Sequence, residues 1–259
     1  MKNTNYFFLL LSFFAFGQES ISSEHIGKTP FKADALIGID AFKTLFFTKN
    51  NTLIAKKEKE TLKYSNIQLG TISSANTFNP LKINVFYKAF NTVVILDNRL
   101  AEIYKIDFNA INSYRNVTHI STGSDNTFWL YNQDDQVLEL FDYKTNKTRA
   151  KTLPIKSDIL DIASNYNTCW LLTKDYLYAY NYFGSLLFKI ENTGFTTLRE
   201  SNDNLLLKKE NKLFYLNKGT RAFVPISIPN LLINQFLVLN EIVYIYHDGF
   251  LHQYLIKKK

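Results

Sequence analysis

The chain has 259 residues, of which 46% are apolar and 15% aromatic, and its formal net charge is +7. This apolar content is enough for a packed interior and argues against intrinsic disorder. No stretch approaches the roughly 20 consecutive apolar residues that a transmembrane helix needs. The composition therefore favours a folded, soluble protein over a disordered or membrane-spanning one.

Residues 1–17 have the pattern of a secretory signal peptide. Lys2 gives the start a positive charge, residues 6–16 form an apolar run, and Ala15 and Gly17 provide the small residues of a cleavage site. We therefore expect an exported protein, located in the periplasm or at the outer membrane.

The mature chain is expected to begin at Gln18 and to form a single domain over residues 18–259. It keeps 29 basic and 23 acidic residues, because Lys2 leaves with the signal peptide. The only cysteine, Cys169, lies far from the new N-terminus, so we expect no lipid anchor there and no internal disulfide. Cys169 is interpreted as a small buried residue.

Short apolar strands recur along the mature chain in six units. The strands align at Leu45, Val93, Phe128, Cys169, Leu205 and Val243, with successive spacings of 48, 35, 41, 36 and 38 residues. A period of about 40 residues that contains only strands and turns is typical of a four-stranded propeller blade. The sequence therefore predicts an all-β fold, a six-bladed β-propeller of four-stranded antiparallel blades.

The individual strands follow in chain order. The first inner strand is expected at 35–39. The second unit is predicted at 83–87, 92–96, 101–106 and a weaker 110–114, after a long loop within 65–81. The third unit is predicted at 117–122, 127–131, 137–141 and 148–153, and the fourth at 159–163, 168–172, 176–180 and 185–190. The fifth is predicted at 196–199, 204–208, 212–216 and 222–228.

The sixth unit has only three predicted strands, at 236–239, 242–246 and 250–256. Residues 20–31, at the other end of the chain, belong to no unit. An open ring would expose strand edges that are prone to pairing with other chains. We therefore predict that the N-terminal segment 20–31 pairs with 250–256, completes the last blade and closes the ring.

Period and strand order resemble the six-bladed propellers of the NHL, YVTN and PQQ-like repeat kind over residues 20–259. The signature motifs of WD, Kelch and quinoprotein repeats are not found in the sequence. The short signal peptide and the richness in Asn, Lys, Phe and Tyr resemble secreted proteins of the Bacteroidota.

No pattern of catalytic or metal-binding residues can be recognised. The four histidines, His25, His119, His247 and His252, have no zinc-ligand spacing. Gly-x-Ser-x-Gly and phosphate-loop motifs are absent. We therefore assign no catalytic residue and expect no cofactor and no metal.

Ligands of propellers usually approach the central channel, so polar residues on or just after the inner strands are the candidate channel-mouth residues. They are Asp40, Lys88, Asp125, Asp161, Asn165, Arg199 and Glu200. The set is chemically mixed. Convergence of several carboxylates or histidines at the channel would favour an enzyme, a hydrolase or a lyase.

A row of tyrosines is the candidate aromatic binding face. Tyr176, Tyr178 and Tyr180 alternate along one strand and share a face, and Tyr182 continues the spacing into the next turn. Packing between blades is the favoured interpretation of this row. A platform that binds a glycan or a peptide is the alternative.

The basic residues interleave with acidic ones, as in residues 56–60, which read Lys-Lys-Glu-Lys-Glu. An exported chain with such a mixed surface is not expected to bind nucleic acid, whereas peripheral association with a membrane surface remains an alternative.

The favoured function is a non-catalytic scaffold that binds a protein partner in a cell-envelope assembly. A propeller hydrolase or lyase and a glycan-binding module are the alternatives, and the oligomeric state stays open.

Overall fold

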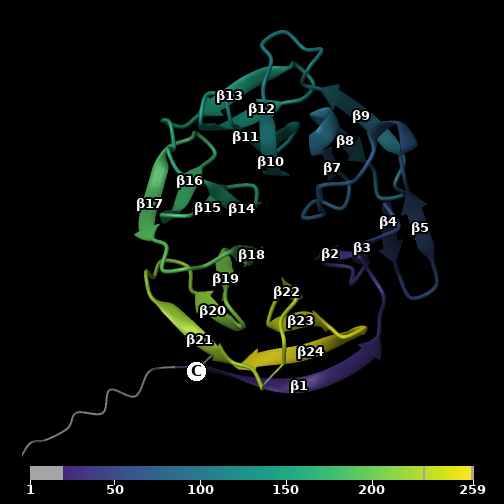
Figure 1. Ribbon diagram of the computed structural model, residues 1–259, viewed down its shortest axis with the longest axis vertical. Coiled ribbons are helices and arrows are strands. Elements are labelled where there is room, and N and C mark those ends of the chain that lie inside the picture. Colours follow the sequence, from purple (N-terminus) through teal and green to yellow (C-terminus); the bar gives the residue numbers. More distant parts are fainter. Residues whose placement is uncertain (1–19, 230, 258–259) are drawn as a thin grey trace, which may run out of the picture.

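The structure is a computed structural model that describes residues 20–229 and 231–257. The described residues form a ring of antiparallel sheets around a central channel (Figure 1). The predicted signal peptide 1–17 and the cleavage before Gln18 lie outside them. Within the described residues, no helix is long and apolar enough to cross a membrane.

Four sheets of the described part have four antiparallel strands each. The first contains β2 (Ala35–Ile39), β3 (Leu45–Lys49), β4 (Thr52–Lys56) and β5 (Thr61–Tyr64). The second contains β6 (Ser74–Asn76), β7 (Ile83–Tyr87), β8 (Thr92–Leu96) and β9 (Glu102–Asp107). The third contains β10 (Val117–Thr122), β11 (Thr127–Asn132), β12 (Val137–Asp142) and β13 (Lys147–Lys151). The fourth contains β14 (Ile159–Ser164), β15 (Thr168–Thr173), β16 (Tyr176–Asn181) and β17 (Leu186–Glu191). Two short 3-10 helices, η1 (Ile67–Leu69) and η2 (Lys88–Phe90), lie in connections.

The remaining strands form one eight-stranded sheet in the order β18-β19-β20-β21-β1-β24-β23-β22. Their bounds are β18 (Thr197–Ser201), β19 (Asn204–Lys209), β20 (Lys212–Leu216), β21 (Phe223–Ser227), β22 (Gln235–Leu239), β23 (Ile242–His247), β24 (Phe250–Lys257) and β1 (Ile21–Pro30). Two antiparallel halves meet where β1 runs parallel to β21 over only two residue pairs, Ile21 with Ile226 and Ser22 with Ser227.

The predicted all-β fold of four-stranded antiparallel sheets is confirmed, but the prediction of six separate blades is wrong. The described residues form four four-stranded sheets and one eight-stranded sheet. The physical reason lies at the start of β1, which extends past its main partner and reaches β21. There the Ser23 hydroxyl also donates to the carbonyl oxygen of Ser227 at 2.6 Å. These contacts join two sets of strands that the sequence pattern separates.

The predicted pairing of residues 20–31 with 250–256 is confirmed. β1 pairs antiparallel with β24 from Ser22 opposite Lys257 to Pro30 opposite Phe250, with an irregularity between His25 and Gly27. Figure 1 shows the two strands, one from each end of the sequence, side by side along the lower edge of the ring.

The strands of the second sheet differ from those predicted for the second unit. Its inner strand, β6, lies in the stretch 65–81, for which the sequence predicts a loop, and the strand predicted at 110–114 does not form. Residues 92–96 are therefore the third strand of this sheet and not the second. The three residues of β6, Ser-Ala-Asn, carry little β-strand preference, and they are held as a strand by pairing with β7.

Apolar residues fill the spaces between neighbouring sheets. Trp129 packs between the third and fourth sheets, and Trp170 packs between the fourth sheet and β18–β21. Both are buried, as their equivalent places on β11 and β15 predict.

Cys169, directly before Trp170 on β15, is fully buried, and this burial raises the pKa of its thiol well above the usual value. Its interpretation as a packed residue is confirmed.

Deleting residues 20–31 is expected to lower stability strongly, because it removes the whole β1–β24 ladder and exposes the edge of β24. The truncated protein should melt at a lower temperature and aggregate. Thermal unfolding followed by circular dichroism, with light scattering, measures both effects. A melting temperature and solubility equal to those of the chain beginning at Gln18 would contradict a structural role for β1.

Stability is also expected to fall in mild acid. His252 on β24 is buried, and this burial, together with Lys28 and His25 on β1 and His247 on β23, lowers the pKa of its imidazole. The unfolded chain takes up protons near pH 6.5, whereas folded His252 resists protonation until the pH is lower. Stability is therefore full above about pH 6.5 and declines below it.

Urea unfolding at about pH 7.5 and about pH 5.5 checks this expectation. Burial also lowers the pKa of His119, so the decline should be reduced in a His252→Gln variant but not abolished. Equal pH dependence in the variant and the parent would contradict the contribution of His252.

Candidate functional site

The central channel holds a cavity of about 450 Å³. It is lined by residues of the six innermost strands of the described sheets, β2, β6, β10, β14, β18 and β22, each of which lies beside the next around the ring. Of the seven predicted channel-mouth residues, Asp161, Arg199 and Glu200 line this cavity. Asp40, Lys88, Asp125 and Asn165 do not.

Asp161 and Arg199 form an ion pair between neighbouring inner strands, β14 and β18. The Arg199 Nη1 donates to Asp161 Oδ2 at 3.0 Å, and the backbone N–H of Leu198 donates to the same oxygen at 3.0 Å. The other carboxylate oxygen accepts from the backbone N–H of Ile162 at 2.9 Å. Arg199 also donates to the carbonyl oxygen of Leu198 at 2.6 Å, while its Nε is buried with no hydrogen-bond partner. The pair therefore ties two sheets together, and the Nε donor of Arg199 is left without a partner.

Glu200 lies one residue further along β18. Its Oε1 accepts from the backbone N–H of Asp203 at 2.9 Å and from the side-chain amide of Asn165 at 3.4 Å. Burial raises the pKa of its carboxyl group, and these two hydrogen bonds offset part of that effect. Asn165 donates to Asp203 Oδ1 at 2.6 Å as well, so this predicted residue links the β14–β15 turn to the β18–β19 turn.

The other three predicted residues lie in turns and connections. Asp40 Oδ1 accepts from the backbone N–H groups of Phe42 at 2.9 Å and Thr44 at 2.8 Å, which builds the β2–β3 turn. Lys88 lies in η2, where its backbone N–H donates to Ser73 Oγ at 3.0 Å. Asp125 offers its backbone carbonyl oxygen, which accepts from Lys82 Nζ at 2.7 Å.

Lys82 has a structural role that no motif in the sequence indicates. Its ammonium also donates to the carbonyl oxygens of Gly123 at 3.0 Å and Thr127 at 2.9 Å, so all three of its protons are used. Burial lowers the pKa of Lys82 to about 8. The residue fastens the β6–β7 loop to the β10–β11 turn, and no donor is left for a ligand.

His119 on β10 lines the channel, although the sequence offered no ligand spacing around it. Its Nδ1 lies 3.0 Å from the hydroxyl of Thr118. Burial lowers the pKa of the imidazole, while Asp161 on the next inner strand acts in the opposite direction. Its position on an inner strand is the one signal that could have identified it.

The channel therefore combines a histidine with a lowered pKa, a glutamate with a raised pKa and a paired Asp–Arg couple. Lys208 also lines it, from β19. Within residues 20–229 and 231–257, no three His, Cys, Asp or Glu side chains are placed to hold a metal ion together. Such an arrangement can bind a small polar ligand or exchange a proton with one.

The tyrosine row divides into a packed part and an exposed part. Tyr178 and Tyr180 stack at 6.0 Å between ring centroids and belong to the apolar cluster between the third and fourth sheets. Tyr176 contacts Tyr178 and lies 3.5 Å from the ammonium of Lys189. Tyr182 alone is exposed. The predicted inter-blade packing thus holds for the middle of the row, and the four rings do not form one open platform.

Tyr182 belongs to a different aromatic surface. It touches Phe183 in the β16–β17 turn, with ring centroids 4.1 Å apart. Tyr166, in the neighbouring β14–β15 turn, meets Phe78 of the β6–β7 loop edge-on at 5.0 Å. Thr168 pairs with Asn181, which places the turns of Tyr166 and Tyr182 next to each other. We call Phe78, Tyr166, Tyr182 and Phe183 the aromatic rim. All four are exposed, and Phe78 also lines the channel.

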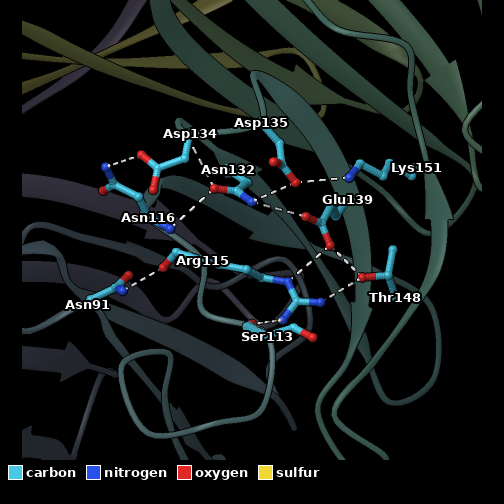
Figure 2. A network of polar contacts seen from close by, with 10 residues as sticks. All are labelled: Asn91, Ser113, Arg115, Asn116, Asn132, Asp134, Asp135, Glu139, Thr148 and Lys151. Carbon is cyan, nitrogen blue, oxygen red and sulfur yellow. Dashed lines mark hydrogen bonds and ion pairs between the residues drawn. The ribbon is translucent and has the colours of Figure 1, made fainter.

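A second charged cluster lies within the third sheet. Arg115 donates through Nε to Glu139 Oε2 at 3.0 Å, through Nη1 to the carbonyl oxygen of Ser113 at 2.8 Å, and through Nη2 to the Thr148 hydroxyl at 3.0 Å. Thr148 in turn donates to Glu139. Figure 2 shows the guanidinium of Arg115 directed at Glu139 and Thr148, with Asn132 on the other side of the carboxylate. Because its buried charges have partners, this network is a structural cross-link.

Removing one member of this buried pair is expected to cost about 3–5 kcal/mol of stability, because the other charge is left buried without its partner. The variants Arg115→Met and Glu139→Leu test this in urea unfolding. The double variant should lose less than the sum of the two single losses. Single losses below about 1 kcal/mol, or strictly additive losses, would contradict the coupling.

No family model and no curated protein matches the chain. Solved structures match its fold. A catalytically inactive variant of virginiamycin B lyase from Staphylococcus aureus with quinupristin aligns at TM-score 0.62 and 13% identity, over 88% of this chain and 83% of the other. A chain of a mitotic checkpoint complex aligns at TM-score 0.58 and 9% identity, over 99% and 100% of the two chains. A streptogramin B lyase aligns at TM-score 0.57 and 11% identity, over 92% and 98%.

These identities are too low to transfer an activity, and they define the class of protein by its fold alone. The chain is a β-propeller protein.

Proposed function

We propose that this protein is an exported, non-catalytic scaffold that binds a protein partner in a cell-envelope assembly. The observation that carries the proposal is the aromatic rim. Exposed Tyr and Phe side chains on neighbouring turns are typical of the centre of protein–protein interfaces, where aromatic residues bury large areas at a small cost in conformational entropy.

The surroundings of the rim support this role. Two of the segments that carry it are held by hydrogen bonds between sheets: the β6–β7 loop by the three from Lys82, and the β14–β15 turn by the one from Asn165 to Asp203. Such cross-links hold the segments of Phe78 and Tyr166 in place before a partner arrives, which lowers the cost of ordering on binding. Export rests on the pattern of residues 1–17 and is part of the proposal.

A double variant, Tyr166→Ser with Phe183→Ser, tests the proposal. It should abolish co-purification of the partner from native envelopes, identified by mass spectrometry after cross-linking. The control is Ile67→Ser in η1, which removes an even more exposed apolar side chain away from the rim. Unchanged partner recovery with the double variant, at an unchanged melting temperature, would refute binding through the rim.

A propeller hydrolase or lyase is the second candidate, and one observation favours it. Glu200 and His119 line the same cavity and have pKa values shifted in opposite directions from their usual values. If the channel is catalytic, turnover in a screen of esters, lactones and cyclic depsipeptides should be lost in both Glu200→Gln and His119→Ala. Turnover that survives both substitutions, or no turnover by the parent protein, would refute it.

A further inference from the structure

A second cavity, of about 330 Å³, opens between the fourth sheet and the β18–β21 half of the eight-stranded sheet. We call it the side cavity. Trp170, Leu205 and Leu216, which belong to the apolar cluster between these strands, line it together with Leu187 and Phe188 of β17. Asn167, directly after Tyr166, lines it too, so the cavity adjoins the aromatic rim.

The β20–β21 turn, residues 217–221, forms one wall of the side cavity and is held by three hydrogen bonds. The backbone N–H of Lys218 donates to Asn204 Oδ1 at 2.9 Å, and Thr220 donates twice to the carbonyl oxygen of Asn217. Gly219 has φ +78°, with nothing within 4 Å of the position of a Cβ. The wall therefore exists before any ligand binds.

The charges that line the side cavity do not cancel. Lys218 pairs with Asp203 at 2.6 Å, and this contact is the main cause of the lowered pKa of Asp203. Arg221 has no carboxylate partner among the described residues. Its guanidinium lies over the Phe188 ring at 4.0 Å and gives one hydrogen bond, at 2.9 Å, to the carbonyl oxygen of Thr220. An apolar hollow thus has an unpaired, oriented guanidinium beside it.

We propose that the side cavity binds an acidic peptide segment of the partner. A large apolar side chain of the segment enters the hollow between Trp170 and Leu187, and a neighbouring Asp or Glu carboxylate pairs with Arg221. The volume is at the lower end for ligand pockets and suits a single side chain anchor. A guanidinium held over an aromatic ring can still bind a carboxylate through its remaining donors. The proposal rests on the proposed scaffold function and names the chemistry of its partner.

The probe is the synthetic peptide acetyl-Gly-Asp-Phe-Asp-Gly-amide, with binding followed by calorimetry and by tryptophan fluorescence, to which Trp170 at the cavity contributes. Binding should weaken about tenfold or more when both Asp residues become Asn, because a charge-assisted hydrogen bond is lost. It should also weaken strongly when the Phe becomes Ala. Equal binding of all three peptides, or none by the first, would overturn the proposal.

Protein variants locate the site. Arg221→Gln, at an exposed position where folding is not at risk, should weaken binding about tenfold or more, and higher salt should reduce the affinity of the parent protein but affect the variant less. The matched control is Arg99→Gln in the β8–β9 turn, another exposed arginine, which should leave binding unchanged. Equal affinity of the Arg221 variant and the parent would overturn the assignment. Tighter binding of acetyl-Gly-Gly-Phe with a free C-terminus than of the acidic probe would do so too.

These outcomes are separate from those of the rim experiment. Failure of the acidic probe, with partner recovery still lost in the Tyr166→Ser and Phe183→Ser double variant, refutes the side cavity alone. Unchanged partner recovery in that double variant refutes the scaffold function through the rim, and with it the partner assigned to the side cavity.

Discussion

The structure depends on one ladder of backbone hydrogen bonds, the pairing of β1 with β24. Every other strand in the described residues pairs with a strand close to it in the sequence or across a short connection, as in β10–β13. Only β1 joins the two ends of the chain. Forming this ladder brings together residues that are more than 200 positions apart, which is costly in chain entropy. A ring of sheets with exposed edges at the joint is the alternative, and such edges invite aggregation.

The channel and the rim use polar and aromatic residues in different ways. In the channel, Asp161 accepts a hydrogen bond from the backbone N–H of Leu198 on β18, and Glu200 accepts one from Asn165 in the β14–β15 turn, so part of their hydrogen-bonding capacity is used to join sheets. On the rim, Phe183 is 67% exposed, and Tyr182 is its one aromatic neighbour among the described residues. An interaction surface is expected where apolar side chains lack internal partners, and the rim meets this condition better than the channel.

The apolar strands could be predicted from the sequence, because β11 and β15 combine β-branched, aromatic and aliphatic residues between clear turns. β6 could not, since its three small or polar residues become a strand only through tertiary pairing with β7. Nor could the joining of β21 to β1, which depends on two residue pairs and a single side-chain contact. Periodicity contains no information on contacts of that kind.

The site was predicted only in part for a related reason. Asp40 and Asn165 follow inner strands, as a channel residue would, but an Asp or Asn at this place is also what a tight turn needs, and the structure uses both in turns. His119 lies within a strand and has no motif around it. The side cavity is formed by segments from two sheets, so Trp170 and Arg221 meet only in the folded ring.

The direction of the β1–β24 pair determines how the ring responds to mechanical load. Ser22 lies opposite Lys257, so the outermost described residues of both ends are at the same end of the ladder. A force that pulls these two ends apart loads the outermost residue pair first. The hydrogen bonds between the strands then break one pair after another. A force applied to both strands along their length would have to break many hydrogen bonds together. We therefore expect the β1–β24 joint to open more easily under tension between its own two ends than under shear along the strands.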